Sequence, residues 1–253
     1  MEKKNKIKKI YVRRTDTFLF SNLTENWKIK KEQKSAISAY NQSKRWLDLL
    51  ISCAKNDEEK RLVIDYVIEI LKRDLQYDTM SRIIYNNKQN FRFLFPYQYL
   101  DQDGDMKSIF CEEEEKEIDL SKDFILSCPW NYSRLPNALG FIKRDSFKFM
   151  ENNHFGMYFK PIDLCLIYNG YHSITSGIYL EQGTITIKKV YDITPLFSNV
   201  FTDGYHWYSV HTNEILFLKI EDFRIAILFE AAKAKFDLHN KLEIMHASTI
   251  DSR

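Results

Sequence analysis

The stretch "MYFKPIDLCLIYN" (Met157–Asn169), continued by "GYHS" (Gly170–Ser173), decides the fold. Its apolar runs predict one or two buried strands, because a continuous apolar run is typical of a strand that is covered on both faces. Asn169 and Gly170 then permit a tight or left-handed turn. Ser173 is suited to cap the helix that we expect to run to Leu180. The stretch therefore predicts a buried strand, a polar turn and a helix in direct succession.

Short helices and strands alternate through the rest of this half of the chain. We expect a short helix over Asn131–Ile142, a strand over Thr184–Ile193 and a hairpin over Gly204–Ile220 that turns near Thr212 and Asn213. A long amphipathic helix follows over Glu221–Leu242. Mixed elements at this spacing predict a compact α/β domain over residues 123–253.

The first half of the chain differs in composition and in predicted secondary structure. All seven glycines lie at or beyond Gly104 and all five prolines at or beyond Pro96, so residues 15–95 are predicted to be helices joined by polar links. The helices are expected at Glu32–Ala54, Asp57–Leu75 and Asp78–Asn87, with Asn56 or Asp57 as a cap. The fold class is therefore α+β, with an N-terminal all-helical domain before the mixed α/β domain.

Charge divides the chain further. Residues 1–14 form a basic arm with five lysines and two arginines against one glutamate, and residues 96–122 read as an acidic linker. The aspartates of "DQDGD" (Asp101–Asp105) superficially suggest a calcium loop, but the glycine stands fourth where such a loop needs it sixth. We therefore expect no calcium site in this linker.

Several classes of protein are disfavoured by composition. A formal charge of +2 gives no general case for nucleic acid, and no window is apolar enough for a membrane span. We expect a cytoplasmic protein. His206 and His211 would face opposite sides of a strand, and the four cysteines have no ligand spacing, so no metal is indicated, and a nucleotide is the one possible cofactor.

The turn at Gly170–Ser173 has two possible roles. A helix start presents backbone N–H groups and the positive end of the helix dipole, which together attract anions. His172 at that position can add a hydrogen bond or, when protonated, a charge for a phosphate. In the alternative reading, Ser173 only caps the helix and His172 is packed.

This order of elements resembles the ParB-like/sulfiredoxin-like superfamily over roughly residues 125–195. Its members carry G-E-R-R, G-C-H-R or D-G-Q-H-R at the turn that holds the phosphates of a nucleotide, where this chain has Gly170–Ser173. "CPWNYSRLPNALGFI" (Cys128–Ile142) looks like the family's N-P-x-x-R entry, with Asn131 and Arg134 as its polar members. A closer resemblance, to an uncharacterised group of bacterial proteins that share an N-G-x-H-S turn, implies no activity.

The resemblance implies a ligand site made of Asn131, Arg134, Asn169, Gly170, Tyr171, His172 and Ser173. Tyr171 replaces the family's reactive cysteine or glutamate, which excludes sulfiredoxin chemistry. Ser173 replaces the terminal arginine and so lacks the planar fork that grips a phosphate. Nucleotide or anion binding remains the implied role, and the presence of any catalysis stays open.

Two interpretations of function remain. The first is binding of a phosphate-bearing ligand, a nucleotide or a nucleic-acid backbone, with help from the basic arm. The second is a protein-interaction factor in bacterial or phage defence or counter-defence, which docks a partner through its helical half on a non-catalytic ParB-like scaffold. Two aromatic stretches, "FRFLFPYQY" (Phe91–Tyr97), with basic residues near it, and "YHWYSV" (Tyr205–Val210), resemble base-stacking platforms, but buried strands and interfaces show the same pattern more often.

Overall fold

The computed structural model describes the backbone of residues 2–85 and 91–250, and the side chains of residues 28–85, 91–216 and 218–243. The helices are α1 (Glu2–Cys53), α2 (Asp57–Ser81), α3 (Leu135–Asp145), α4 (Tyr171–Tyr179), α5 (Leu196–Asn199) and α6 (Phe223–Ile250). The strands are β1 (Gln98–Leu100), β2 (Met106–Ser108), β3 (Phe110–Cys111), β4 (Lys116–Asp119), β5 (Phe124–Leu126), β6 (Phe155–Lys160), β7 (Leu164–Asn169), β8 (Thr184–Ile187), β9 (Val190–Asp192), β10 (Val200–Thr202), β11 (His206–Ser209) and β12 (Ile215–Lys219).

A five-stranded sheet in the order β3-β9-β6-β7-β5 forms the centre of the mixed part. The strands β6 and β7 pair antiparallel, while β7 pairs parallel with β5 and β6 pairs parallel with β9. The predicted strands of Met157–Asn169 are thus confirmed as two neighbours, and β7 has a strand on either side.

Alternate residues of β7 enter two different cores. Leu164 and Leu166 belong to the core shared with the helices, whereas Cys165 and Ile167 belong to the core beneath α4, β4 and β8. All four are fully buried. Because successive side chains of a strand point to opposite faces, a strand covered on both sides needs an uninterrupted apolar run. This explains the sequence "LCLI".

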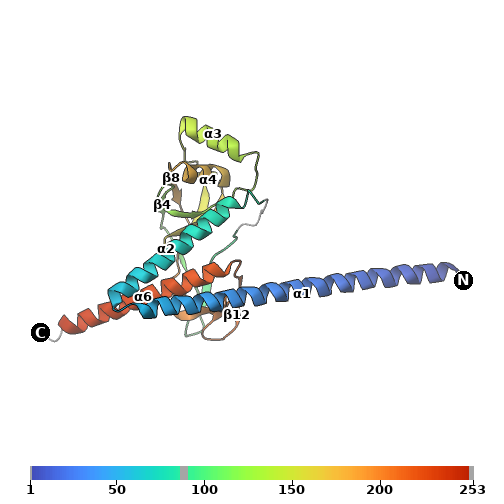
Figure 1. The fold of residues 1–253 in the computed structure, drawn as a ribbon, viewed down its shortest axis with the longest axis horizontal. Coiled ribbons are helices and arrows are strands. Elements are labelled where there is room, and N and C mark those ends of the chain that lie inside the picture. The colour runs from blue at the N-terminus through green and yellow to red at the C-terminus, as the bar shows by residue number, and fades with distance from the viewer. Residues whose placement is uncertain (1, 86–90, 251–253) are drawn as a thin grey trace.

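The helical part is built from both ends of the chain, as Figure 1 shows: α6 lies along α1, and α2 crosses from this pair towards the sheet. Glu230 of α6 accepts hydrogen bonds from Tyr40 at 3.1 Å and from Lys44 at 2.9 Å, both on α1. On the sheet side, the Gln76 side chain of α2 accepts the N–H of Ile125 in β5 at 2.7 Å. The helix expected over Glu221–Leu242 therefore completes the helical layer rather than the sheet.

The chain between α2 and β5 differs from the sequence-based expectation. Residues 96–122 are not an exposed linker, because β3 pairs with β9 of the central sheet and β4 pairs with β8. Ile118 and Leu120 are buried in the core under α4. The pattern misled because charged residues dominate the exposed positions, which hides the few apolar residues that anchor the segment.

The third predicted helix, Asp78–Asn87, is also absent as a separate element where the structure describes it. Helix α2 continues without a break to Ser81, and residues 82–85 form turns; residues 86–90 lie outside the described part. Asn56 caps α2 as expected, since its side chain accepts the N–H of Glu59 at 2.8 Å. Beyond the helices, Phe91 and Phe95 are buried in the main core, so the first aromatic stretch is largely interior.

The hairpin predicted over Gly204–Ile220 is confirmed as β11 and β12, with Asn213 in a left-handed turn at φ 58°. With β10 these strands form a three-stranded sheet, whose Trp207 is fully buried against Phe95 and Phe229. The α+β class is confirmed, with the first helices followed by a mixed α/β part. The basic arm belongs to α1 in backbone, and its side chains lie outside those described.

The length and hydrophobicity of the helices show whether any of them could cross a membrane. Among the described residues, none of the helices combines the length and the apolar character that crossing a bilayer requires.

Candidate functional site

Gly170 makes the turn between β7 and α4 that the sequence predicted. It holds a left-handed conformation, φ 82° and ψ 17°, and occupies the N-cap position of α4. A Cβ at this position would lie 2.6 Å from Cδ2 of His154, so both the backbone angle and the space favour glycine. Ser173 is therefore not the N-cap, and that expectation is wrong: it is the third residue of the helix.

The Ser173 side chain is turned inward to a histidine that the sequence did not suggest. Its Oγ lies 2.8 Å from Nε2 of the buried His154 and 3.0 Å from the carbonyl oxygen of Gly170. Nδ1 of His154 accepts the N–H of Met150 at 3.1 Å, so the ring proton lies on Nε2 and is donated to Ser173. The serine hydroxyl in turn donates to Gly170. This pair closes the turn and leaves no activated hydroxyl.

His172 is held on the other side of the turn. Its Nε2 accepts the backbone N–H of Asn131 at 3.1 Å, and its ring contacts Trp130 edge-on at 5.7 Å. Burial lowers the pKa of His172, and the nearby charge of Arg134 lowers it further. The ring is thus an acceptor with a reduced tendency to be charged, which does not fit the expected role as a charged phosphate donor.

The remaining predicted residues are occupied in separate places. The Asn131 side chain accepts the backbone N–H of Ser133 at 2.9 Å, and the Arg134 guanidinium lies 5.8 Å from the centre of the Trp130 ring. The Asn169 amide donates to the Asn153 side chain at 3.3 Å. These contacts are local and do not converge on one cavity.

Helix geometry explains the dispersal. Successive residues of an α-helix are rotated by about 100°, so three neighbours at its start project in three directions. Tyr171 faces a large cleft, His172 faces Asn131, and Ser173 faces His154. The residues Gly170–Ser173, which the sequence suggested as one site, therefore point to different places. Of the three that belong to α4, only Tyr171 lines the cleft.

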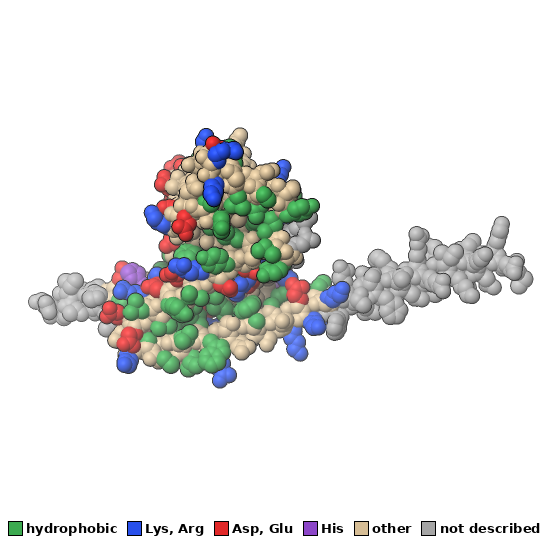
Figure 2. All heavy atoms as spheres, turned by 45° about the horizontal axis from the view of Figure 1, so that its top comes forward, with side chains coloured by type: hydrophobic (Ala, Val, Ile, Leu, Met, Phe, Trp, Pro, Cys, Tyr) green, Lys and Arg blue, Asp and Glu red, His purple; other side chains and the backbone are tan. Residues whose placement is uncertain are grey.

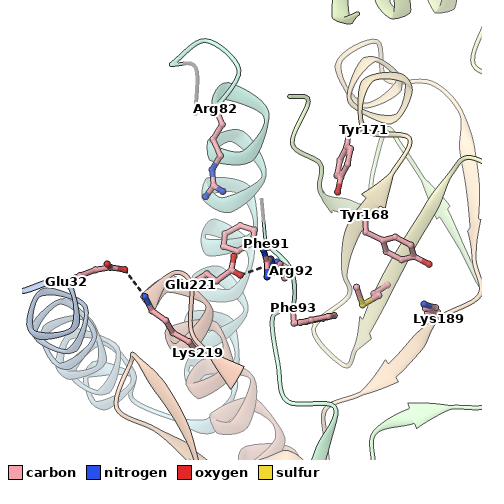
Figure 3. Close-up of a pocket in the computed structure, with 11 residues that line it drawn as sticks. Glu32, Arg82, Phe91, Arg92, Phe93, Tyr168, Tyr171, Lys189, Lys219 and Glu221 are labelled. Carbon is pink, nitrogen blue, oxygen red and sulfur yellow. Dashed lines mark hydrogen bonds and ion pairs between the residues drawn. The ribbon is translucent and has the colours of Figure 1, made fainter. Parts of the chain in front are cut away.

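The cleft has a volume of about 840 Å³ and lies between the helical part and the central sheet. Figure 3 shows its walls: α1 and the chain around β12 on one side, residues 91–93 in the middle, and β7, the start of α4 and Lys189 on the other. The basic residues that line it are Arg82, Arg92, Lys189 and Lys219, the acidic residues are Glu32 and Glu221, and the aromatic residues are Phe91, Phe93, Tyr168 and Tyr171, with Met157 beside them. Basic side chains therefore outnumber acidic ones.

Two of the basic side chains are already paired. Lys219 donates to Glu32 at 2.8 Å and lies over the Tyr205 ring at 4.4 Å. Arg82 is bound to Asp78 at 2.8 Å and lies 4.8 Å from the centre of the Phe91 ring. These pairs fix the side chains on the helical side of the cleft and partly neutralise them.

The other two basic side chains are different. Lys189 lies over the Tyr168 ring at 5.0 Å, and no carboxylate in the described part of the chain forms an ion pair with it. Arg92 is exposed, and its guanidinium likewise has no ion pair among the described residues; only its backbone N–H is used, by Glu221 at 3.4 Å. Both charges are accessible to an anion in the cleft.

Two further cavities adjoin this cleft. One of about 920 Å³ shares Glu32 and Glu221 with it and runs between α1 and the start of α6. A smaller one of about 280 Å³ shares Tyr168 and Lys189.

In the space-filling view of Figure 2, acidic and basic side chains alternate along the junction between the upper and lower parts of the molecule.

Sequence reasoning missed most of the cleft because its residues come from segments far apart in the chain. The only local signal was the set of basic residues beside the aromatic run at Phe91–Tyr97. Within the described residues, no three His, Cys, Asp or Glu side chains are grouped to hold a metal ion.

Comparison with known proteins gives a family. No curated protein and no solved structure matches the chain in the corresponding comparisons. Residues 19–242 match the model of a family of unknown function (DUF6710), and because this match covers well over half of the chain, the protein belongs to that family.

Proposed function

We propose that the cleft binds a phosphate-bearing ligand, and specifically a nucleotide. The observation that carries this proposal is the combination of accessible cations and aromatic rings around one cavity of about 840 Å³. Ligand pockets of small molecules are clefts of several hundred Å³, lined by apolar rings with a few well-placed polar groups.

The phosphate end of the ligand is assigned to Lys189 and Arg92. Both side chains are exposed at the cleft and lack a carboxylate partner among the described residues. Arginine suits this role because its planar guanidinium donates two parallel hydrogen bonds to a phosphate, and lysine acts there as a compact point charge. Arg92 lies in the middle of the cleft and Lys189 on the side of the central sheet, as Figure 3 shows, so two parts of the cleft carry a positive charge.

The base of the ligand is assigned to stack on one of the aromatic side chains, which line both the middle of the cleft and the wall of Lys189. Tyr168, Tyr171 and Phe93 are each partly exposed, so part of every ring is available to a ligand. Contact between a nucleobase and an aromatic ring contributes about 1–3 kcal/mol. Tyr171 also places the start of α4 beside the cleft, where the helix dipole favours negative charge.

The resemblance to ParB-like proteins supports a nucleotide through the order of elements, since β7, the Gly170 turn and α4 follow in the expected succession. The phosphate contacts change, however. Asn131, Arg134 and His172 are engaged away from the cleft, and the proposal does not use them.

Thermal unfolding with ATP, GTP, CTP, UTP and inorganic phosphate tests the proposal. A ligand at a hundred times its Kd stabilises the folded state by about 2.7 kcal/mol, which raises Tm by several degrees. We expect at least one nucleotide to do so. Lys189→Met and Arg92→Met should each reduce the shift, while Lys148→Met, which removes an exposed lysine outside the cleft, should not. No shift with any nucleotide contradicts the proposal, as does an equal shift in all variants.

Protein binding through the helical part is the second candidate function. Leu62, Tyr66 and Ile70 are spaced four apart on α2, and Leu62 and Tyr66 are 61% and 63% exposed. On α1, Trp46 is 57% exposed. Such a row of exposed apolar side chains on a helix is typical of a surface that another protein covers. This candidate includes the defence or counter-defence role that the sequence suggested.

A photo-crosslinking amino acid at position 66 tests this second candidate in cells that produce the protein. The substitution replaces one exposed aromatic side chain by another and should leave the fold unchanged. Adducts that form from position 66 and not from position 148 support a partner on α2. Equal labelling from both positions, or none, contradicts it.

A further inference from the structure

Glu221 and Glu32 are the two lining residues that the cleft and the adjoining cavity of about 920 Å³ have in common. Glu221 lies between β12 and α6. Glu32 is already paired with Lys219, whereas Glu221 forms no ion pair with any described residue. The one free carboxylate among the described lining residues thus stands where the two cavities meet.

The hydrogen-bonding capacity of this carboxylate is largely unused. Its Oε1 accepts a long hydrogen bond from the Arg92 backbone N–H at 3.4 Å, and no donor in the described part of the chain reaches Oε2. Three basic side chains act on this carboxylate through their charges: Lys219 is paired with Glu32, Arg82 is paired with Asp78, and Arg92 forms no ion pair with it. Although Glu221 is accessible to solvent, the protein around it raises the pKa of the carboxyl, mainly by removing water from it.

A carboxylate without an ion pair and with an unused oxygen favours a ligand that presents two hydrogen-bond donors side by side. An ionised carboxylate only accepts hydrogen bonds, and its two oxygens bind best to two N–H groups that point the same way. Guanine presents such a pair, N1–H and the 2-amino group. Adenine and cytosine place a ring nitrogen acceptor beside their amino group, and uracil places carbonyl oxygens on both sides of its N–H.

We propose that Glu221 is a specificity residue that binds the N1–H and 2-amino groups of a guanine base, so that the preferred ligand of the cleft is a guanine nucleotide. This inference rests on the proposed function, because it assigns one end of the same ligand. It places the base beside Phe93, towards the junction of the two cavities, and the phosphates towards Lys189 on the opposite wall, with Arg92 in the middle of the cleft in Figure 3.

Calorimetric titration of the full chain with GTP, ATP and ITP tests the assignment. Inosine keeps N1–H and lacks the 2-amino group, so it separates the two hydrogen bonds. A bidentate contact of this kind discriminates between bases by roughly tenfold to a hundredfold. We expect GTP to bind at least about tenfold more tightly than ATP, with ITP between them.

Glu221→Gln supplies the decisive comparison. The amide keeps the size of the side chain but offers one acceptor and one donor group, so GTP affinity should fall, while ATP affinity should not, because adenine presents an amino donor beside a ring nitrogen acceptor. Glu214→Gln removes an exposed carboxylate from the turn of the same hairpin and should change neither. An unchanged Tm for each variant without ligand confirms that the fold is intact.

The outcomes separate the two proposals. If nucleotides bind the wild-type protein with equal affinity, or if GTP preference survives in Glu221→Gln, the guanine assignment is overturned and nucleotide binding stands. If no nucleotide binds, the proposed function fails and this inference fails with it. A preference for GTP that disappears only in Glu221→Gln supports both.

Discussion

Nε2 of the buried His154 lies 2.8 Å from Oγ of Ser173, and this contact joins the segment before β6 to the first turn of α4. The histidine donates, because its other nitrogen already accepts the N–H of Met150. A serine and a histidine at this distance suggest nucleophilic catalysis at first sight. The direction of the hydrogen bonds instead makes them a clamp on the glycine turn.

Removal of that clamp should destabilise the fold. In Ser173→Ala the Nε2–H of His154 loses its partner in a buried position, which costs about 1–3 kcal/mol. The free energy of unfolding, measured by urea denaturation at neutral pH, should fall by this amount. Ser198→Ala, whose exposed hydroxyl donates to the Pro195 carbonyl at 3.5 Å and accepts from the Asn199 side chain at 3.2 Å, should change it by less than about 0.5 kcal/mol. Equal effects of the two substitutions would contradict the clamp.

Gly170 should tolerate no side chain. Gly170→Ala forces a left-handed backbone, at about 1–2 kcal/mol, and brings Cβ to 2.6 Å from His154. We expect a loss of about 2 kcal/mol or more in the free energy of unfolding. The control is Gly140→Ala within α3, where a Cβ meets nothing within 4 Å; it should stabilise the protein by about 0.5–1 kcal/mol. A neutral Gly170→Ala variant would show that the turn is not strained.

Stability should fall as the pH is lowered from 7.5 to 5.5. Burial lowers the pKa of His154 and of His172 in the folded protein. A base with a lowered folded-state pKa binds fewer protons when folded, so its contribution to stability is present above the unfolded-state pKa, about 6.5. It is lost as the pH falls below that value. Urea midpoints across this range provide the measurement.

The variant His172→Gln checks the origin of this pH dependence. Its amide oxygen can still accept the Asn131 N–H, but the side chain does not titrate. The decline between pH 7.5 and 5.5 should therefore be shallower than in the wild-type protein. An identical slope in the two proteins would mean that His172 does not contribute.

Arg224 holds the start of α6 against α2, behind the cleft. It bonds Asp74 at 2.7 Å, Asp78 at 3.0 Å and Asp222 at 2.6 Å. Burial alone would lower its pKa, but the hydrogen bonds and charges of Asp222 and Asp74 outweigh burial and raise it. Arg224→Met should cost about 2 kcal/mol or more, since Asp74 and Asp222 lose their ion pair with Arg224. Arg73→Met, which breaks an exposed pair with Glu69, should cost less than about 1 kcal/mol. Chemical denaturation of both variants makes the comparison, and a similar loss in each would contradict the stated role of Arg224.

Local patterns predicted local structure well. The run at Leu164–Ile167 predicted a buried strand, Gly170 a left-handed turn, and Thr212 and Asn213 the turn of a hairpin, each of which depends on neighbouring residues only. The start of α2 at Asn56 is of the same kind. These features are decided by backbone angles and by side-chain period, both of which are readable in a short window.

Long-range relationships were not predictable in this way. Nothing local shows that α6 packs on α1, that Phe110 pairs with Tyr191, or that Glu221 and Lys189 line one cleft. The candidate site failed for a related reason: Tyr171, His172 and Ser173 are adjacent in sequence but are rotated apart by the helix. Pairing and packing over such separations are decided by the whole core.

Amide hydrogen exchange of the full chain with and without GTP is the most direct test of nucleotide binding in the cleft. The account predicts slower exchange with GTP in three separate segments, residues 91–95, 168–173 and 218–223, which border the cleft from both sides. Exchange in α3 and in the β1–β2 hairpin should not change. Absence of protection in all three segments, or protection confined to residues 131–145 around the Asn131–His172 contact, would contradict it.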